Sequence, residues 1–273
     1  MKTTNSTQQS GTETTGIDRE QDVRLGLPPL FYVLSAGRTG TVFLENLIKR
    51  HCPDVTAEHE PSPSRYLMML GNLRNDTGLL ARTTRFMARK HQQRMHGHDQ
   101  KYIEINPFLC PVTDQLQNAH RPLRIVHIVR APGDWAHSIT TFNASTRYRH
   151  IINYVPFAKP FPAKRPEGWS RMTPFEKSLH RWNWCNSRIA ALEPVADSYV
   201  LVRSEDIFSN NPETRSDALA RIFATLELPI PEEINAEEFS KKVNPSPDGV
   251  NLRDAASEKE ICGSLAATFG YEL

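Results

Sequence analysis

The sequence predicts an α/β fold with a central parallel β-sheet flanked by helices. Two apolar runs rich in aromatic and β-branched residues, Leu30–Ser35 and Leu123–Val129, are typical of buried strands. Each run is followed by a turn that contains glycine and then by a stretch whose apolar residues recur at helical spacing. Because parallel strands need a crossover connection, strands that alternate with helices in this way are typical of a parallel sheet.

The remaining elements follow from the same patterns. A helix is expected over Thr41–Arg50, where apolar side chains can face the sheet while charged ones stay in water. Two more strands are expected at Lys101–Ile105 and Ser198–Val202. Proline-rich stretches at Ala144–Thr173 and Asn244–Arg253 are expected to form loops over the face where the strands end. Further helices are predicted near Trp135 and over Phe175–Leu192, Glu213–Leu226 and Ser257–Phe269.

Composition and charge limit what the chain can do. Its 273 residues include 33 basic and 31 acidic side chains, and this net charge of +2 is too balanced for a protein that wraps on nucleic acid. Residues 1–26 are polar and are expected to form a disordered tail, with residues 27–273 as a single domain. With neither an apolar signal segment nor a run of about 18 apolar residues, we expect a soluble cytoplasmic protein without a membrane span. The four cysteines form no CxxC pair, which argues against a zinc ribbon or a disulfide framework.

The turn after the first strand has the features of a phosphate-binding loop. Gly37 and Gly40 allow close approach of the backbone, and Thr39 and Thr41 add hydroxyl donors at the start of a helix. Arg38 adds a permanent charge that can reach two oxygens of one phosphate. The alternative is a tight turn without a ligand. The loop lacks the lysine that precedes the Ser or Thr of a Walker A motif, which argues against an ordinary ATPase or kinase.

The stretches SAGRTGTVFLENLI and RIVHIVRAPGDWAHS resemble two elements of one enzyme family. The first is similar to the 5′-phosphosulfate loop of the sulfotransferases that use 3′-phosphoadenosine 5′-phosphosulfate (PAPS), especially the carbohydrate sulfotransferases. The second is similar to their 3′-phosphate element, and Arg130 and Ser138 fall on its phosphate-binding positions. Weaker similarity is found in Val202–Ile207 and in the final ICGSLAATFGY. The resemblance implies a P-loop-like sulfotransferase architecture, PAPS as the sulfuryl donor, and no metal.

The resemblance also implies a reaction. A sulfuryl group would move to a hydroxyl or amine acceptor by in-line displacement, with Arg38 stabilising the departing phosphate. Glu60 is the first candidate for the general base and His59 the second, because carbohydrate sulfotransferases carry an acidic residue followed by proline at this place. Glu104 is a third candidate, since a carboxylate within a buried strand needs a partner or a task. The alternatives are a solvated acidic loop at 57–61 and a structural ion pair for Glu104. The expected partners are a nucleotide donor and a small-molecule or glycan acceptor.

Two other classes of protein remain open at this stage. A P-loop-type nucleotide kinase would need a lysine and a magnesium site that the sequence does not show. A non-catalytic anion-binding module would use the stretch Arg74–Lys101, which has seven Lys or Arg and only two acidic residues. That stretch is either a solvated helix face or a basic wall that receives an anionic donor or acceptor. Its histidines, His91, His96 and His98, lack carboxylate or thiolate neighbours at metal-ligand spacing, so no metal site is expected.

Overall fold

The computed structural model describes residues 28–62, 64–117, 122–141, 159–231, 234, 239 and 253–273. The expected N-terminal tail, the first half of the expected loop Ala144–Thr173, and the expected loop Asn244–Arg253 except for its last residue lie outside these residues. Among the helices that are described, none combines the length and apolar character needed to cross a membrane.

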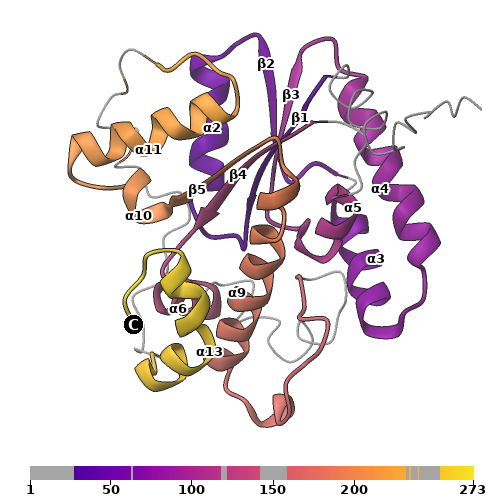
Figure 1. The fold of residues 1–273 in the computed structure, drawn as a ribbon, viewed down its shortest axis with the longest axis vertical. Coiled ribbons are helices and arrows are strands. Elements are labelled where there is room, and N and C mark those ends of the chain that lie inside the picture. Colours follow the sequence, from indigo (N-terminus) through magenta and orange to yellow (C-terminus); the bar gives the residue numbers. More distant parts are fainter. Residues whose placement is uncertain are drawn as a thin grey trace, which may run out of the picture.

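Five of the described segments form a parallel β-sheet: β1 (Leu30–Ser35), β2 (Val55–His59), β3 (Lys101–Asn106), β4 (Leu123–Val129) and β5 (Ser198–Arg203). Their order across the sheet is β2-β3-β1-β4-β5 (Figure 1). β1 is central, with Phe31 opposite Ile103 on one side and Leu30 opposite Leu123 on the other. Every neighbouring pair in the sheet is parallel, which confirms the predicted α/β class with a central parallel sheet.

Among the described strands, the edge strand β2 is the one that the sequence patterns do not predict. It pairs with β3 alone, and Ala57 is the one residue of its five that is fully buried. A short edge strand of this kind carries no apolar run, because most of its side chains stay partly in water. The interpretation of residues 57–61 as a solvated loop is therefore wrong for Ala57–His59, which are paired with β3.

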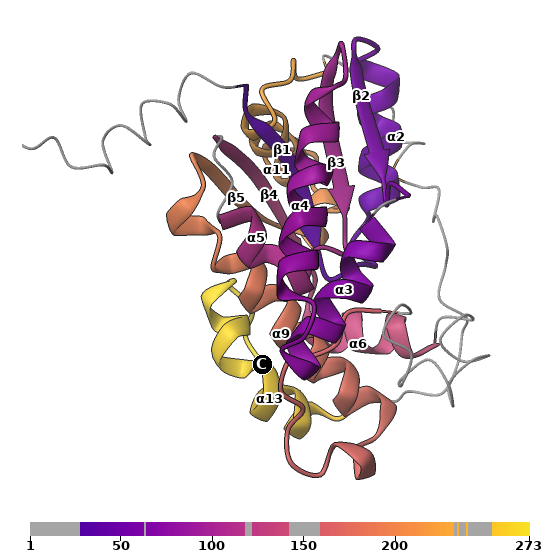
Figure 2. The ribbon, with the colours of Figure 1, turned by 90° about the vertical axis from the view of Figure 1, so that its right-hand side faces the viewer.

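Helices cover both faces of the sheet. Alternate side chains of β1 point to opposite faces, so Val33 and Tyr32 belong to different hydrophobic clusters. Helices α2 (Thr41–His51) and α11 (Pro212–Thr225) close the cluster around Val33. The cluster around Tyr32 is closed by α3 (Ser64–Thr77), α4 (Ala81–His96), α6 (Pro132–Thr141), α9 (Pro174–Ala190) and α13 (Ala255–Thr268), as Figures 1 and 2 show. Short helical turns complete the described chain at η1 (Cys110–Val112), α5 (Thr113–Gln117), η2 (Trp169–Arg171), η3 (Glu193–Val195) and α10 (Ser204–Ile207).

Helix α9 packs against both α6 and α13 and has a well-defined start. The Thr173 side chain accepts a hydrogen bond from the Glu176 amide, and the Glu176 side chain accepts one from the Thr173 amide. Further along the helix Trp182 is fully buried, and Trp184 packs against the same cluster while partly exposed. The helix therefore brings one of its two tryptophans into the core, as their spacing of two residues predicts.

Candidate active site

The two loops singled out by the sequence lie side by side. Because β1 and β4 are parallel neighbours, their carboxyl ends meet at the same edge of the sheet. The loop after β1 turns sharply: Gly37, Arg38 and Gly40 have φ angles of 87°, 57° and 88°. This left-handed backbone region suits glycine and strains other residues, so Arg38 is held in a conformation that L side chains rarely adopt.

Direct contacts join the two loops. Arg38 Nε donates to Ser138 Oγ on α6 at 3.2 Å. Arg130 Nη1 donates to the Arg38 carbonyl oxygen at 3.3 Å. The indole Nε1 of Trp135 donates to the Gly37 carbonyl oxygen at 2.6 Å, which fixes the start of α6 against the first loop. The structure thus brings together Arg38, Arg130 and Ser138, residues far apart in the sequence.

The electrostatics of this corner favour an anion. Burial lowers the pKa of the Arg38 guanidinium, and the positive charge of Arg130 lowers it further. Burial also lowers the pKa of Arg130, an effect that Glu205 opposes and the charge of Arg253 reinforces. A phosphate placed between Arg38 and Arg130 would offset their repulsion and make charge-assisted hydrogen bonds with both.

The first loop also offers neutral donors. Helix α2 begins at Gly40 without a side-chain cap and without an acidic residue in its first turn. Its first amides therefore have no carboxylate supplied from within the helix, which suits them to an anion. Thr39 Oγ1 is buried and has no hydrogen-bond partner among the described residues. A buried hydroxyl without a partner is costly, and a phosphate oxygen would satisfy it.

The start of α6 is arranged differently. The Ala131 amide donates to Glu205 Oε1 at 2.9 Å, and the Gly133 amide donates to Glu258 Oε1 at 2.7 Å. Because these two carboxylates already accept from the amides at the start of α6, an anion at the second corner would be bound by the side chains of Arg130 and Ser138. Glu205 also accepts from Tyr271 Oη at 2.8 Å. The weakly similar segments after β5 and at the C-terminus therefore brace this corner.

The end of β2 reaches the first loop from the other side. His59 Nε2 shares a hydrogen bond of 2.9 Å with Thr41 Oγ1. Glu60, the next residue, has a φ of 51° and a carboxylate oxygen 4.0 Å from the same His59 nitrogen. Arg38 and Glu60 are thus two of the four described non-glycine residues with positive φ, and such strain often marks functional positions. The structure places both leading candidates for the general base beside the phosphate-binding loop.

Glu104 lies in a different environment. Its side chain is 0% exposed, and its Oε2 lies 2.6 Å from Nε2 of His91 on α4. Asn106 Nδ2 donates to the other carboxylate oxygen. Both oxygens therefore have structural partners inside the core. Within the described part of the chain, no three His, Cys, Asp or Glu side chains gather as a metal site would require.

The basic stretch Arg74–Lys101 does not form one surface. Arg74 makes a bidentate ion pair with Asp114, with both N–O distances at 2.8 Å, and so ties α3 to α5. Arg82, Arg85 and Arg89 are exposed on α4. The stretch thus divides into a structural arginine and a solvated helix face.

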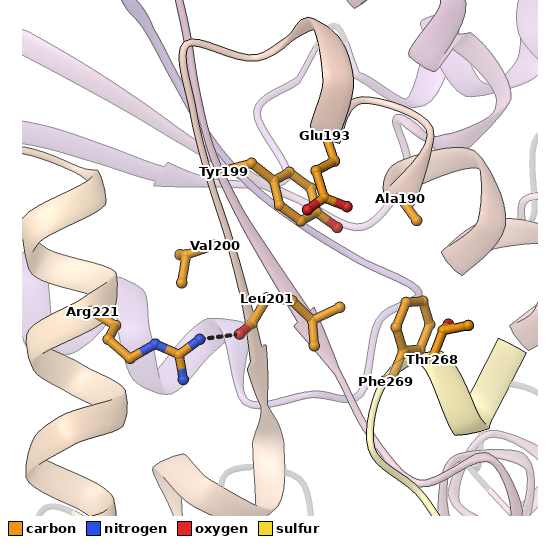
Figure 3. Close-up of a pocket in the computed structure, with 8 residues that line it drawn as sticks. All are labelled: Ala190, Glu193, Tyr199, Val200, Leu201, Arg221, Thr268 and Phe269. Atoms are coloured by element: carbon orange, nitrogen blue, oxygen red, sulfur yellow. Dashed lines mark hydrogen bonds between the residues drawn. The ribbon is translucent and has the colours of Figure 1, made fainter.

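A cavity of about 380 Å³ lies away from these loops. It opens beside the edge strand β5, where Tyr199 and Leu201 face Phe269 and Arg221 donates to the Leu201 carbonyl oxygen (Figure 3). No residue of the Arg38 or Arg130 loop lines it. The cavity therefore belongs to a different region of the molecule.

Comparisons with known proteins identify structures with a similar fold. No protein-family model matches the sequence, and no curated protein matches it significantly. The structure is similar to the sulfotransferase domain from the curacin biosynthetic pathway, with a TM-score of 0.55 and 12% identity over 90% of this chain and 99% of that one. It is also similar to the sulfotransferase domain from the Synechococcus PCC 7002 olefin synthase, with a TM-score of 0.52 and 16% identity over 90% of this chain and 96% of that one. The chain has a sulfotransferase fold. This confirms the predicted architecture, and at such low identity the similarity concerns the fold alone.

Proposed function

We propose that the protein transfers a sulfuryl group from PAPS to a hydroxyl or amine acceptor. The observation that carries this proposal is the contact between two strand ends, in which Arg38 reaches Ser138 and Arg130 reaches the Arg38 backbone. One adenosine bisphosphate can then have its 5′-phosphate in the Arg38 loop and its 3′-phosphate between Arg130 and Ser138. The sulfotransferase fold and the sequence resemblance support the same assignment. Carbohydrates are the acceptor class to test first, because the loop resembles that of carbohydrate sulfotransferases.

In the proposed reaction the acceptor oxygen or nitrogen attacks sulfur in line with the bond that breaks. A new bond to sulfur forms, the bond between sulfur and the bridging oxygen breaks, and its electron pair stays on the 5′-phosphate of 3′-phosphoadenosine 5′-phosphate (PAP). Arg38 is the cation placed to stabilise this added negative charge, and Thr39, Gly40 and Thr41 hold the phosphate. The acceptor proton passes to a base on the protein.

Glu60 is the base that we propose, with His59 as the second candidate. His59 ends β2 and Glu60 follows it, both at the edge of the phosphate-binding loop. A carboxylate at this place can accept the proton of the acceptor. His59 already shares a hydrogen bond with Thr41. A role in orienting that hydroxyl therefore suits His59 better, because its ring nitrogen is engaged. Glu60→Gln should abolish the acidic limb of the pH profile of kcat, whereas His59→Gln should retain that limb at a lower rate.

Thermal unfolding with nucleotides tests the donor. PAP at about 100 times its Kd should stabilise the protein by roughly 2.7 kcal/mol, whereas AMP, which lacks the 3′-phosphate, should stabilise it less. Arg130→Met should remove most of the difference between PAP and AMP. Lys49→Met is the matched control, because Lys49 is an exposed cation on α2 that pairs with Glu45.

Each alternative function has its own signature in this experiment. A larger shift with ATP and magnesium than with PAP would contradict the proposal and favour a nucleotide kinase. Stabilisation by simple anions with no preference for PAP over AMP would favour a non-catalytic anion-binding module. Sulfuryl transfer from PAPS to a panel of sugars and simple alcohols then measures activity directly.

A further inference from the structure

A second group of cations lies beside the proposed donor site. Arg181 and Lys177 are on α9, and Lys159 lies in the segment that leads toward this helix; we refer to these three residues as the α9 cation cluster. Arg181 is 8% exposed, and its Nε has no hydrogen-bond partner among the described residues. Among those residues Arg181 forms no ion pair with a carboxylate. Its polar contact is the Cys185 thiol: burial raises the pKa of that thiol, but hydrogen bonds with Cys110 and Arg181 and the charge of Arg181 lower it overall. A buried guanidinium without an acidic partner is expensive unless a ligand supplies the negative charge.

The three cations act on one another. Burial lowers the pKa of the Lys159 ammonium to about 7, and the positive charges of Arg181 and Lys177 contribute to this shift. Lys177 Nζ also lies 5.9 Å from the centre of the Trp169 ring. The cluster thus carries a mutual repulsion that an anion would relieve.

Two tryptophans connect the cluster to the donor site. The Arg181 guanidinium carbon lies 5.4 Å from the centre of the Trp135 ring, and the Nε1 of that ring donates to the Gly37 carbonyl oxygen in the phosphate-binding loop. The next residue on α9, Trp182, donates from its Nε1 to the Arg130 carbonyl oxygen at 2.9 Å. Arg181 is therefore one side chain away from the phosphate-binding loop, and α9 itself contacts the Arg130 loop through Trp182. Figure 1 shows α9 running alongside α6 at this edge of the sheet.

We propose that the α9 cation cluster binds an oxyanion on the acceptor, such as a carboxylate, phosphate or sulfate group, next to the sulfuryl donor. This inference rests on the proposed function and adds the substrate class: an alcohol or amine that already carries a negative charge. Arg181 is suited to recognise such a group because a guanidinium binds two oxygens of a planar or tetrahedral oxyanion. A neutral acceptor would bring no negative charge to the Arg181 guanidinium.

Anion binding with the donor site already filled tests this assignment. The full-length protein is saturated with PAP, and inorganic sulfate is added while sodium chloride at equal ionic strength serves as the control. Sulfate should raise the Tm beyond the PAP shift in the unaltered protein. Arg181→Met and Lys159→Met should each lose this additional shift and keep the PAP shift. Lys49→Met should keep both.

The Arg181→Met variant also has an expected effect on the protein without ligand. Methionine fills a similar space and removes a buried group that has no partner at Nε, so its Tm without ligand should equal or exceed that of the unaltered protein. Loss of the sulfate shift is then not a consequence of misfolding. Lys159→Met provides the independent check, because its side chain comes from a different segment.

The pH dependence gives a second readout. A bound anion raises the pKa of Lys159, so binding takes up a proton near neutral pH and the sulfate shift should grow as the pH falls through about 7. Arg181 and Lys177 are the cations that act on Lys159, and Arg165, nearby on the Phe161 ring, is paired with Asp76. His180 is a further titratable group on α9, with a pKa that burial lowers. The pH dependence should therefore disappear in Lys159→Met and persist in His180→Gln.

Four outcomes would overturn the inference. The first is a full sulfate shift in both Arg181→Met and Lys159→Met. The second is a sulfate shift that saturating PAP removes, because the anion would then occupy a donor phosphate position. The third is sulfate binding at Arg181 in a protein that does not bind PAP, which would also refute the proposed function. A PAP shift without any sulfate shift would refute the anionic acceptor alone.

Discussion

Two regions of the molecule differ in how their buried ionisable groups are paired: one pairs an acid with a base, and the other places two cations side by side. Beneath α4 the buried acid Glu104 faces the base His91, and Asn106 binds its second oxygen. At the carboxyl edge of β1 and β4, by contrast, Arg38 lies beside Arg130, whose charge lowers the Arg38 pKa. A complementary pair is satisfied by the fold itself. Two neighbouring like charges favour an anion between them, so the second arrangement is the one that indicates binding.

The same contrast extends to the histidines. His127 on β4 is fully buried, with Tyr199 Oη 2.7 Å from Nδ1 and Asn186 Oδ1 3.0 Å from Nε2. An amide oxygen accepts, so Nε2 carries the proton and Nδ1 accepts from the tyrosine hydroxyl. His59, which touches Thr41 of the phosphate-binding loop, is partly exposed. Paired polar groups lie within the core, whereas groups that can meet a ligand lie at the strand ends.

Replacing Glu104 should lower the stability of the protein without affecting PAP binding. Glu104→Gln leaves one acceptor oxygen for two donors, His91 and Asn106, so we expect a loss of about 3 kcal/mol in the free energy of unfolding. Urea denaturation measures this loss, and the PAP shift of the folded fraction should be unchanged. A variant of normal stability without sulfuryl transfer would instead make Glu104 the base.

Replacing Arg38 should have the opposite effect: turnover should fall while the fold remains intact. Arg38→Ala removes the cation facing the leaving phosphate, so kcat should fall by about 10²- to 10³-fold. The fold should remain intact because the strained φ of 57° is no better for arginine than for alanine. Arg38→Gly should be equally inactive yet more stable than Arg38→Ala by about 1 kcal/mol, since glycine accepts this backbone conformation. Near-normal turnover in either variant would reject the role of Arg38.

The pH dependence of stability tests whether the buried, paired His127 has a structural role. Burial lowers the pKa of His127 to about 4, while the unfolded chain keeps a value near 6.5. Between these pH values the unfolded state binds a proton that the folded state does not. The contribution of His127 to the free energy of unfolding is therefore complete above about pH 6.5 and is lost as the pH falls toward 4. The loss is at most about 1.4 kcal/mol per pH unit. His127→Gln should flatten this part of the curve, and the partly exposed His98→Gln should not. An unchanged slope in His127→Gln would show that other groups cause the acid sensitivity.

The smallest effect is expected at the exposed ion pair on α2. Lys49 Nζ lies 2.7 Å from Glu45 Oε1, and its side chain is 53% exposed. Exposed pairs of this kind contribute little, so Lys49→Ala should change the free energy of unfolding by no more than about 0.5 kcal/mol and leave PAP binding unchanged. A large effect on PAP binding would mean that the positive field of the site extends along α2.

The sequence predicts the centre of the sheet better than its edge. β1 and β4 have the predicted bounds because both faces of these strands are buried, which leaves continuous apolar runs. β2 is missed because an edge strand with one buried residue carries no such signal. A strand at 55–59 nevertheless decides where His59 and Glu60 lie, so the place of the candidate bases follows from the structure.

The contacts of the candidate site divide in the same way. Glycines and a basic residue between a strand and a helix are visible in the sequence, and the parallel topology then brings Arg38 to Ser138. The Trp135 bond to Gly37 and the burial of Arg181 behind that indole depend on how α9 packs against α6. Packing between distant helices has no short-range pattern, so Arg181 appears in the sequence as an ordinary basic residue beside two tryptophans.

The central place of β1 has a consequence for how the chain is made. This apolar strand is made before both strands that pair with it, since Phe31 pairs with Ile103 and Leu30 with Leu123. Helix α13, which helps to close the layer that covers Tyr32, is made later still. At about 5–20 residues per second, a nascent β1 waits for several seconds before both neighbours exist. During this interval both edges of β1 are unpaired and can pair with another chain, so a chaperone that shields this strand should raise the folded yield.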